Sequence, residues 1–155
     1  MASALNALAV AVEVASRKRD HARQVLQDTL AAQQAARAQL DQLEDYAQEN
    51  QARWGMKADT AIKPEVMFHH YQFMERLGHA ASVQASVVAD HAARVEAARR
   101  SLLEAELRLA SLRKVVDKRR QELALADMRR DQKQTDERAA LRYRSETQDA
   151  AQREY

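Results

Sequence analysis

Apolar residues recur along the first third of the chain at alternating steps of three and four residues. Starting at Leu5, this spacing gives fifteen positions, of which eleven are apolar. A repeat of 3.5 residues is typical of a helix that supercoils against a partner helix. We therefore expect a first helix over about residues 3–54. Its seam comprises Leu5, Leu8, Val12, Ala15, Arg19, Ala22, Leu26, Thr29, Gln33, Ala36, Leu40, Leu43, Ala47, Asn50 and Trp54.

The pattern stops at a predicted turn over about residues 55–63. Gly55 suits the position just past the end of a helix. Pro64 suits the first position of a new helix, and Glu65 is favourable at that N-terminus. A connection this short places two long helices side by side and antiparallel.

A second seam of eighteen positions, fourteen of them apolar, follows the turn. It predicts a helix over about residues 64–140, with a tail over about 141–155 that frays into disorder. Gly78 lies inside this helix at a cost of about 1 kcal/mol relative to alanine. The seam comprises Met67, His70, Met74, Leu77, Ala81, Gln84, Val88, His91, Val95, Ala98, Leu102, Ala105, Leu109, Leu112, Val116, Arg119, Leu123 and Ala126.

Together the two seams predict an all-α fold: a long antiparallel two-helix coiled-coil hairpin, with the second helix extending past the first, in a single domain over residues 1–155. If the turn centres near Asp59, Leu5 lies level with Arg113. Residues after about Lys114 should then have no partner helix within the chain.

Composition agrees with this fold. The chain has two glycines, one proline and no cysteine. Residues that favour strands and tight turns are scarce, which excludes a sheet, and the apolar residues are mostly alanine, so the seam buries little area. Lack of cysteine excludes a disulfide scaffold and suits a reducing compartment. The apolar stretch Ala4–Val12 precedes Arg17 and Lys18, the reverse of a signal peptide, and no window is long enough to span a membrane.

The charges are balanced overall, with a formal net charge of +2. The stretch from Arg94 to Arg130 contains eleven Lys or Arg residues, six Asp or Glu residues and no aromatic residue. Nucleic-acid readers usually add stacking aromatics to such basic stretches. We therefore expect no nucleic-acid partner. The stretch is either a solvated helix face or a surface that docks a protein.

The sequence offers no catalytic, cofactor-binding or metal-binding constellation. His69 and His70 point about 100° apart on a helix, His79 and His91 are twelve residues apart, and His21 lies on the other helix. No HExxH, GxSxG or P-loop motif occurs, and there is no cysteine nucleophile. We expect no cofactor and no enzymatic activity.

Five of the seven aromatic residues lie near the predicted turn. Antiparallel coiled coils bring the g positions of the two helices together, so g and d residues of both helices should merge on one side. An exposed aromatic and aliphatic patch is typical of a partner site; the alternative is that the rings only cover the seam. The residues concerned are Gln39, Leu43 and Tyr46 in the first helix and Phe73, Leu77 and Ala80 in the second.

Four stretches also carry a resemblance to a known family. They are Leu5 and Leu8 near the start, Gln39-Leu40-x-x-Leu43-x-x-Tyr46, Tyr71-Gln72-Phe73-x-x-x-Leu77-x-x-Ala80, and Asp131-Gln132-Lys133-x-x-Asp136-Glu137. In order, spacing and total length the chain resembles the flagellar export protein FliJ family over nearly its whole length.

This resemblance implies a coiled coil similar to the central stalk of rotary ATPases, acting in flagellar type III protein export. It implies binding to the export ATPase ring and its regulator, to the cytoplasmic domain of the export gate, and to export chaperones. It also implies a cytoplasmic protein held peripherally at the inner membrane beneath the flagellum. The gate-binding residues of the family map onto Gln39, Leu43, Tyr46, Phe73, Leu77 and Ala80.

Three alternatives remain open. One is a helical protein that binds nucleic acid, with an affinity that would fall steeply with salt. The chain could be the equivalent stalk protein of a virulence type III secretion injectisome, with the same fold and a different ATPase ring. It could also be a coiled-coil scaffold unrelated to export, which would assemble into stable higher oligomers.

Overall fold

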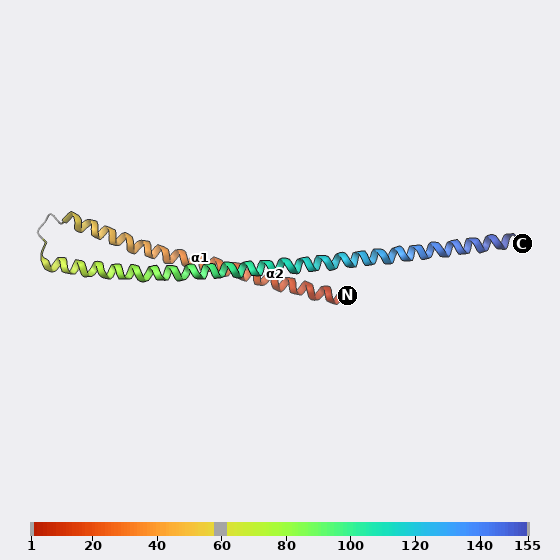
Figure 1. Ribbon diagram of the computed structural model, residues 1–155, viewed down its shortest axis with the longest axis horizontal. Helices are drawn as coiled ribbons and strands as arrows, with labels where there is room; N and C mark the ends of the chain where they lie inside the picture. Colours follow the sequence, from red (N-terminus) through yellow and green to blue (C-terminus); the bar gives the residue numbers. More distant parts are fainter. Residues whose placement is uncertain (1, 58–61, 155) are drawn as a thin grey trace. The chain divides into compact units, whose positions relative to one another are not determined.

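The computed structural model describes residues 2–57 and 62–154, which form two long helices (Figure 1). Helix α1 spans Ala2–Lys57 and helix α2 spans Pro64–Arg153. No strand occurs in these two stretches. The helices pack against each other in antiparallel directions, so the expected all-α coiled-coil hairpin is confirmed.

The N-terminus of α2 is built as the sequence predicts. Pro64 is the first helical residue, and Glu65 lies in the first turn. The carbonyl oxygen of Lys63 accepts hydrogen bonds from the backbone N–H groups of Val66, at 3.1 Å, and Met67, at 3.2 Å. Because proline has no N–H to satisfy and its φ is already helical, this is the position it tolerates best.

Two predicted helix ends were wrong. Helix α1 continues past Gly55 to Lys57, so the turn expected over 55–63 loses its first three residues to the helix; positions 58–61 of that turn lie outside the described residues. Helix α2 continues to Arg153, although a fraying tail was expected from about residue 141. After Gly78 the sequence contains no glycine or proline that would stop a helix.

Residue contacts divide the chain into two compact units. One unit is Ala15–Leu107; the other combines Met1–Val14 with Arg108–Tyr155. Each unit contains a segment of both helices. The single domain expected over 1–155 stays a prediction.

The predicted seam is the core of both units. All fifteen seam positions of α1 are buried or half-buried, and fifteen of the eighteen in α2 are too; the exceptions are Met67, Arg119 and Ala126. In residues 2–57 and 62–154, the eight buried hydrophobic residues all lie at seam positions, and three of them are alanines. These are Ala15, Ala36, Leu77, Val88, Val95, Ala98, Leu109 and Val116. A core this narrow shields little apolar surface per residue, as the alanine-rich composition predicts.

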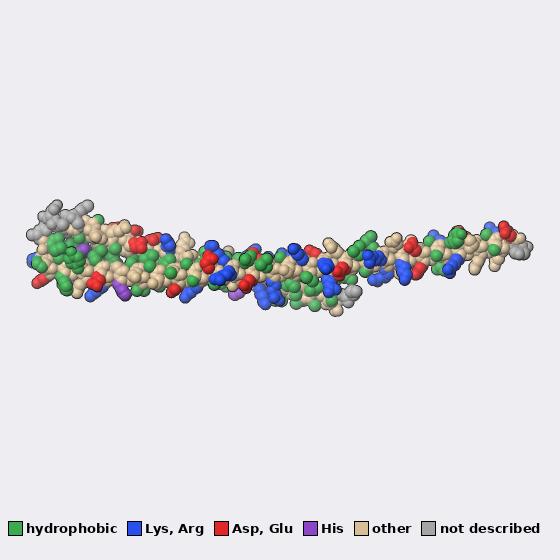
Figure 2. All heavy atoms as spheres, viewed as in Figure 1, with side chains coloured by type: hydrophobic (Ala, Val, Ile, Leu, Met, Phe, Trp, Pro, Cys, Tyr) green, Lys and Arg blue, Asp and Glu red, His purple; other side chains and the backbone are tan. Residues whose placement is uncertain are grey.

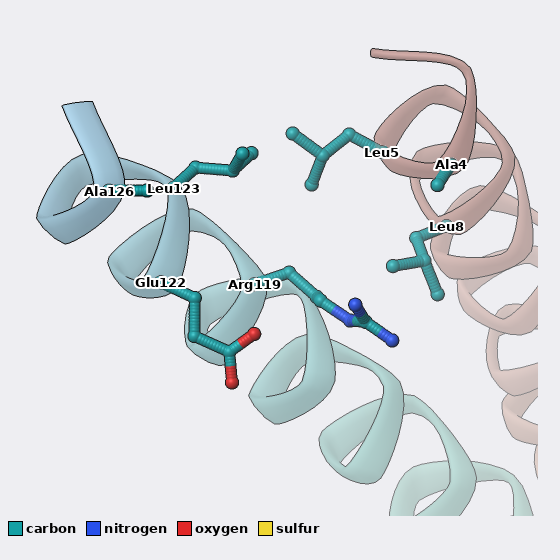
Figure 3. Close-up of a pocket in the computed structure, with 7 residues that line it drawn as sticks. All are labelled: Ala4, Leu5, Leu8, Arg119, Glu122, Leu123 and Ala126. Carbon is teal, nitrogen blue, oxygen red and sulfur yellow. The ribbon is translucent and has the colours of Figure 1, made fainter. Parts of the chain in front are cut away.

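The residue of α2 expected to lie opposite Leu5 was wrong. In the unit that contains both ends of the chain, Leu5 and Leu8 line a pocket of about 110 Å³ together with Leu123. Leu5 and Leu123 point toward each other across it (Figure 3). Leu5 therefore faces a position ten residues further along α2 than the expected Arg113.

The unpaired part of α2 accordingly starts later than Lys114. Val116 is buried and Leu123 is half-buried, whereas every described residue from 124 to 154 is exposed. Lys, Arg, Asp and Glu side chains are interspersed along this section (Figure 2). The prediction that the second helix extends past the first is confirmed; the extension begins after Leu123 and continues to Arg153.

Candidate partner-binding surface

Tyr46 and Phe73 meet across the two helices within the unit Ala15–Leu107. Their ring centroids lie 5.9 Å apart, and the ring planes are nearly perpendicular at 85°. This edge-to-face arrangement places the positive edge of one ring on the negative face of the other, which is worth about 0.5–1.5 kcal/mol beyond the area buried. The g positions of the two helices therefore come together as the sequence predicts.

The pair remains accessible although the two rings touch. Tyr46 is 50% exposed and Phe73 is 40% exposed. Rings that only covered the seam would be shielded by it, whereas these present about half of their surface to solvent. We call the six residues predicted from the sequence the aromatic patch; it comprises Gln39, Leu43, Tyr46, Phe73, Leu77 and Ala80.

The other members of the aromatic patch differ in what they present. Gln39 and Ala80 are exposed, and Leu43 is half-buried. Leu77 is only 8% exposed and belongs to the seam. A partner could touch the first three directly, whereas Leu77 supports the surface from below by packing between the helices.

A glutamine at the edge of the aromatic patch joins the two helices. The side-chain Nε2 of Gln84 donates hydrogen bonds to the carbonyl oxygen of Ala36, at 2.9 Å, and to Oε1 of Gln39, at 3.2 Å. Asn50, at the other edge, turns back to its own helix, because its Nδ2 donates to the carbonyl oxygen of Tyr46 at 3.0 Å. The seam pattern identified Gln84 and Asn50 only as polar entries and did not indicate these bonds.

A second group of aromatic side chains lies close to the turn. The rings of Trp54 and His70 stack, with centroids 4.1 Å apart and planes inclined by 25°. They line an open pocket of about 450 Å³ together with Gln51, Ile62, Met67, Tyr71 and Met74. The sequence analysis missed this stack, although both residues occupy the seam positions that flank the turn. Phe68 and Tyr71 lie nearby at 61% and 66% exposure, outside the aromatic patch.

The charged side chains between Arg94 and Arg130 form few bonds that would hold them in place. Arg99 pairs with Glu96 at 3.7 Å and Arg130 with Asp127 at 3.3 Å within α2, and Glu106 pairs with Arg23 of α1 at 3.8 Å; all three pairs are exposed. Exposed pairs of this kind contribute at most about 1 kcal/mol and are screened by salt. Arginines in this stretch thus remain available to an acidic partner.

Within residues 2–57 and 62–154, no three His, Asp or Glu side chains come close enough together to hold a metal ion. In the same residues neither helix has a stretch long and apolar enough to cross a membrane.

Comparison with known proteins defines the class of this molecule. A model of the flagellar FliJ protein family matches residues 4–148. The fold is similar to that of a protein from Chlamydia trachomatis described as a homologue of YscO, with a TM-score of 0.71 and 18% identity, over 94% of each chain. No curated protein matches the sequence.

The chain therefore belongs to the flagellar FliJ protein family, a family of coiled-coil components of type III protein export. The family resemblance inferred from the sequence is confirmed. The Chlamydia protein shares its fold at a low level of identity and so supports the architecture alone.

Proposed function

We propose that this chain is a non-enzymatic component of a flagellar type III export apparatus that links the export ATPase ring to the export gate. The observation that carries the proposal is the family match over residues 4–148, which includes both halves of the aromatic patch. Such a protein acts by binding and positioning its partners and needs no reactive site or cofactor of its own.

The aromatic patch is the proposed binding site for the cytoplasmic domain of the export gate. Tyr46 and Phe73 combine large apolar area with few rotatable bonds, and such residues dominate the energetics of protein interfaces. They lie on one face with the exposed Gln39 and Ala80. A partner that covers this face would bury both rings without having to separate the helices.

The proposed site for the ATPase ring is the unpaired part of α2 together with the basic stretch that precedes it. Every described residue from 124 to 154 is exposed, and α2 is helical as far as Arg153, so a partner could reach all sides of this part of the helix. Export chaperones and the regulator of the ATPase are proposed as further partners, and a nucleic acid is not. The protein would act in the cytoplasm, held peripherally at the inner membrane by its partners.

The test of the gate site is a binding measurement with a matched control. Tyr46→Ala combined with Phe73→Ala should weaken binding to the purified gate domain at least about tenfold, equivalent to about 1.4 kcal/mol. Phe68→Ala combined with Tyr71→Ala removes two rings of the same kind near the same turn and should leave gate binding unchanged. Helicity and binding to the ATPase should stay at their wild-type values in both variants.

Two results would reject the aromatic patch as the gate site. Equal weakening in both double variants would mean that rings near the turn matter without selectivity. A collapse of helicity in the first variant would mean that Tyr46 and Phe73 serve the fold.

A second candidate is the equivalent stalk protein of a virulence type III injectisome. This candidate has the same expected fold, so the architecture shared with the YscO homologue is compatible with both candidates. The neighbouring genes separate the two: flagellar structural genes support the first candidate, and injectisome genes the second.

A further inference from the structure

Between Leu26 and Leu40 the seam of α1 lacks large apolar side chains. The three intervening seam residues are Thr29, Gln33 and Ala36, none of which has a large apolar side chain. Register in a coiled coil is specified by which bulky side chains fit which spaces, and a shift by seven residues keeps seam positions facing seam positions. In this section apolar packing alone therefore discriminates weakly between the observed register and one displaced by a heptad.

Gln84 of α2 makes its two hydrogen bonds to α1 in this section. Because a carbonyl oxygen can only accept, the contact with Ala36 fixes which end of the Gln84 amide points toward α1. The same nitrogen then requires Gln39 to present its oxygen. Both hydrogen bonds of the Gln84 amide nitrogen therefore cross to α1. They fix the orientation of the Gln84 and Gln39 side-chain amides.

The small size of Ala36 makes the shorter of these bonds possible. Ala36 is 5% exposed, and its methyl group leaves the backbone carbonyl open to the incoming amide. A shift of one heptad would place Gln84 opposite Leu43 and Tyr46, or opposite Thr29 and Ala32, in place of Ala36 and Gln39. Leu43 is bulkier than alanine and Thr29 has a branched side chain, so each crowds its backbone carbonyl more than Ala36 does.

We propose that Gln84 is the residue that fixes the register of the hairpin in the unit Ala15–Leu107. In either shifted register the half-buried amide of Gln84 would lose its acceptors at Ala36 and Gln39, and the sparse seam offers little apolar packing to replace these two bonds. A polar residue at a seam position is known to specify register in some coiled coils, at a cost in stability.

The register in turn determines whether the aromatic patch exists. In the observed register Phe73 meets Tyr46. Displaced by seven residues, Phe73 would face position 39 or position 53, occupied by Gln39 and Arg53. Gln84 is therefore a positioning residue for the two rings. Only its effect on gate binding rests on the proposed function.

Spin labels can measure the register directly, since the chain has no cysteine of its own. Labels at Gln48→Cys and Ala97→Cys sit on exposed positions of α1 and α2, well separated along the pair. A slip of seven residues displaces one helix by about 10 Å relative to the other at 1.5 Å per residue. The distance between the labels changes by nearly that amount.

The wild-type background should give one distance. Gln84→Leu should keep or raise the melting temperature and add a second population displaced by about 10 Å. Gln84→Asn stays polar but is one methylene shorter, and it should also add the second population. Gln33→Leu is the matched control, because it replaces another half-buried seam glutamine that makes none of the cross-helix bonds of Gln84, and it should keep the single wild-type distance.

A single unchanged distance in both Gln84 variants would overturn the proposal. So would the same second population in Gln33→Leu, which would mean that any added leucine loosens the register. These measurements need no partner protein, so they stand even if the gate is not the ligand of the aromatic patch. If it is, Gln84→Leu should lower gate binding in proportion to the slipped population, with both rings still present.

Discussion

Leu109 offers the sharpest test of the thin seam. Its side chain is 2% exposed, the lowest fraction among the buried residues, although the core around it is only two helices wide. Leu107, two residues earlier on the same helix, is 59% exposed. Leu109→Ala and Leu107→Ala therefore make the same chemical change on the same helix and differ only in what surrounds the side chain.

The expected magnitude follows from burial. Truncating leucine to alanine removes three carbons, which at about 0.8 kcal/mol per buried methylene gives about 2–2.5 kcal/mol for a fully buried side chain. In globular cores a residual cavity raises the loss to about 2.7–5 kcal/mol. Between two helices the space can close or fill with water, so we expect about 2–3 kcal/mol for Leu109→Ala. Leu107→Ala should change stability by no more than about 0.5 kcal/mol.

Urea unfolding followed by circular dichroism measures both effects. With a slope of about 1–3 kcal/mol per molar urea, Leu109→Ala should lower the midpoint by about 1–2 M, and Leu107→Ala should leave it nearly unchanged. Alanine and leucine are both strong helix formers, so helix propensity contributes little to either value. Equal destabilisation by the two substitutions would refute the reasoning, because the outer face of α2 would then be as buried as the seam.

Three further outcomes follow from individual residues. Gly78→Ala should raise the free energy of unfolding by about 1 kcal/mol in urea melts, because the added Cβ would meet no atom within 4 Å; a loss of stability would contradict this. Amide hydrogen exchange should be much faster at residues 127–153 than near Val95, since a helix without tertiary packing is marginal in water; equal protection would contradict it. His70→Ala should increase quenching of Trp54 by acrylamide, because it removes the stacked ring, whereas the exposed His79→Ala should not.

The seam could be read from the sequence because it depends on local periodicity alone. A helix places positions three and four residues apart on one face, so the residues that face the partner helix follow from spacing. Every buried residue, from Ala15 to Val116, lies at a predicted seam position. Pro64 was equally predictable, since its preference for the first helical position reflects its own covalent structure.

Local periodicity does not predict which residues of α1 lie opposite which residues of α2. This register depends on where the turn centres and on which side chains pair, and a heptad repeat fits its partner almost equally well after a shift of seven residues. Tyr46 meets Phe73 close to the expected level, whereas Leu5 faces a position ten residues further along α2 than Arg113. The hydrogen bonds from Gln84 to Ala36 and Gln39 could not be predicted either, because a hydrogen bond between two helices depends on their register.

The aromatic patch was predictable in part. The g and d spacing brings Tyr46 and Phe73 together in any register close to the observed one, and the structure shows them in contact. Spacing alone did not reveal that Leu77 is buried beneath the surface. Burial depends on how closely the helices approach each other, which the small residues of α1 determine.

The central claim is that this chain links an export ATPase to an export gate, and reconstitution tests it most directly. The purified chain is mixed with the flagellar ATPase and the cytoplasmic gate domain of the same organism, and complexes are separated by size with their masses determined. We expect one complex that contains all three proteins, from which Tyr46→Ala with Phe73→Ala releases the gate domain and retains the ATPase. Binding of the two partners only in alternation, or of neither by a fully helical chain, would contradict it.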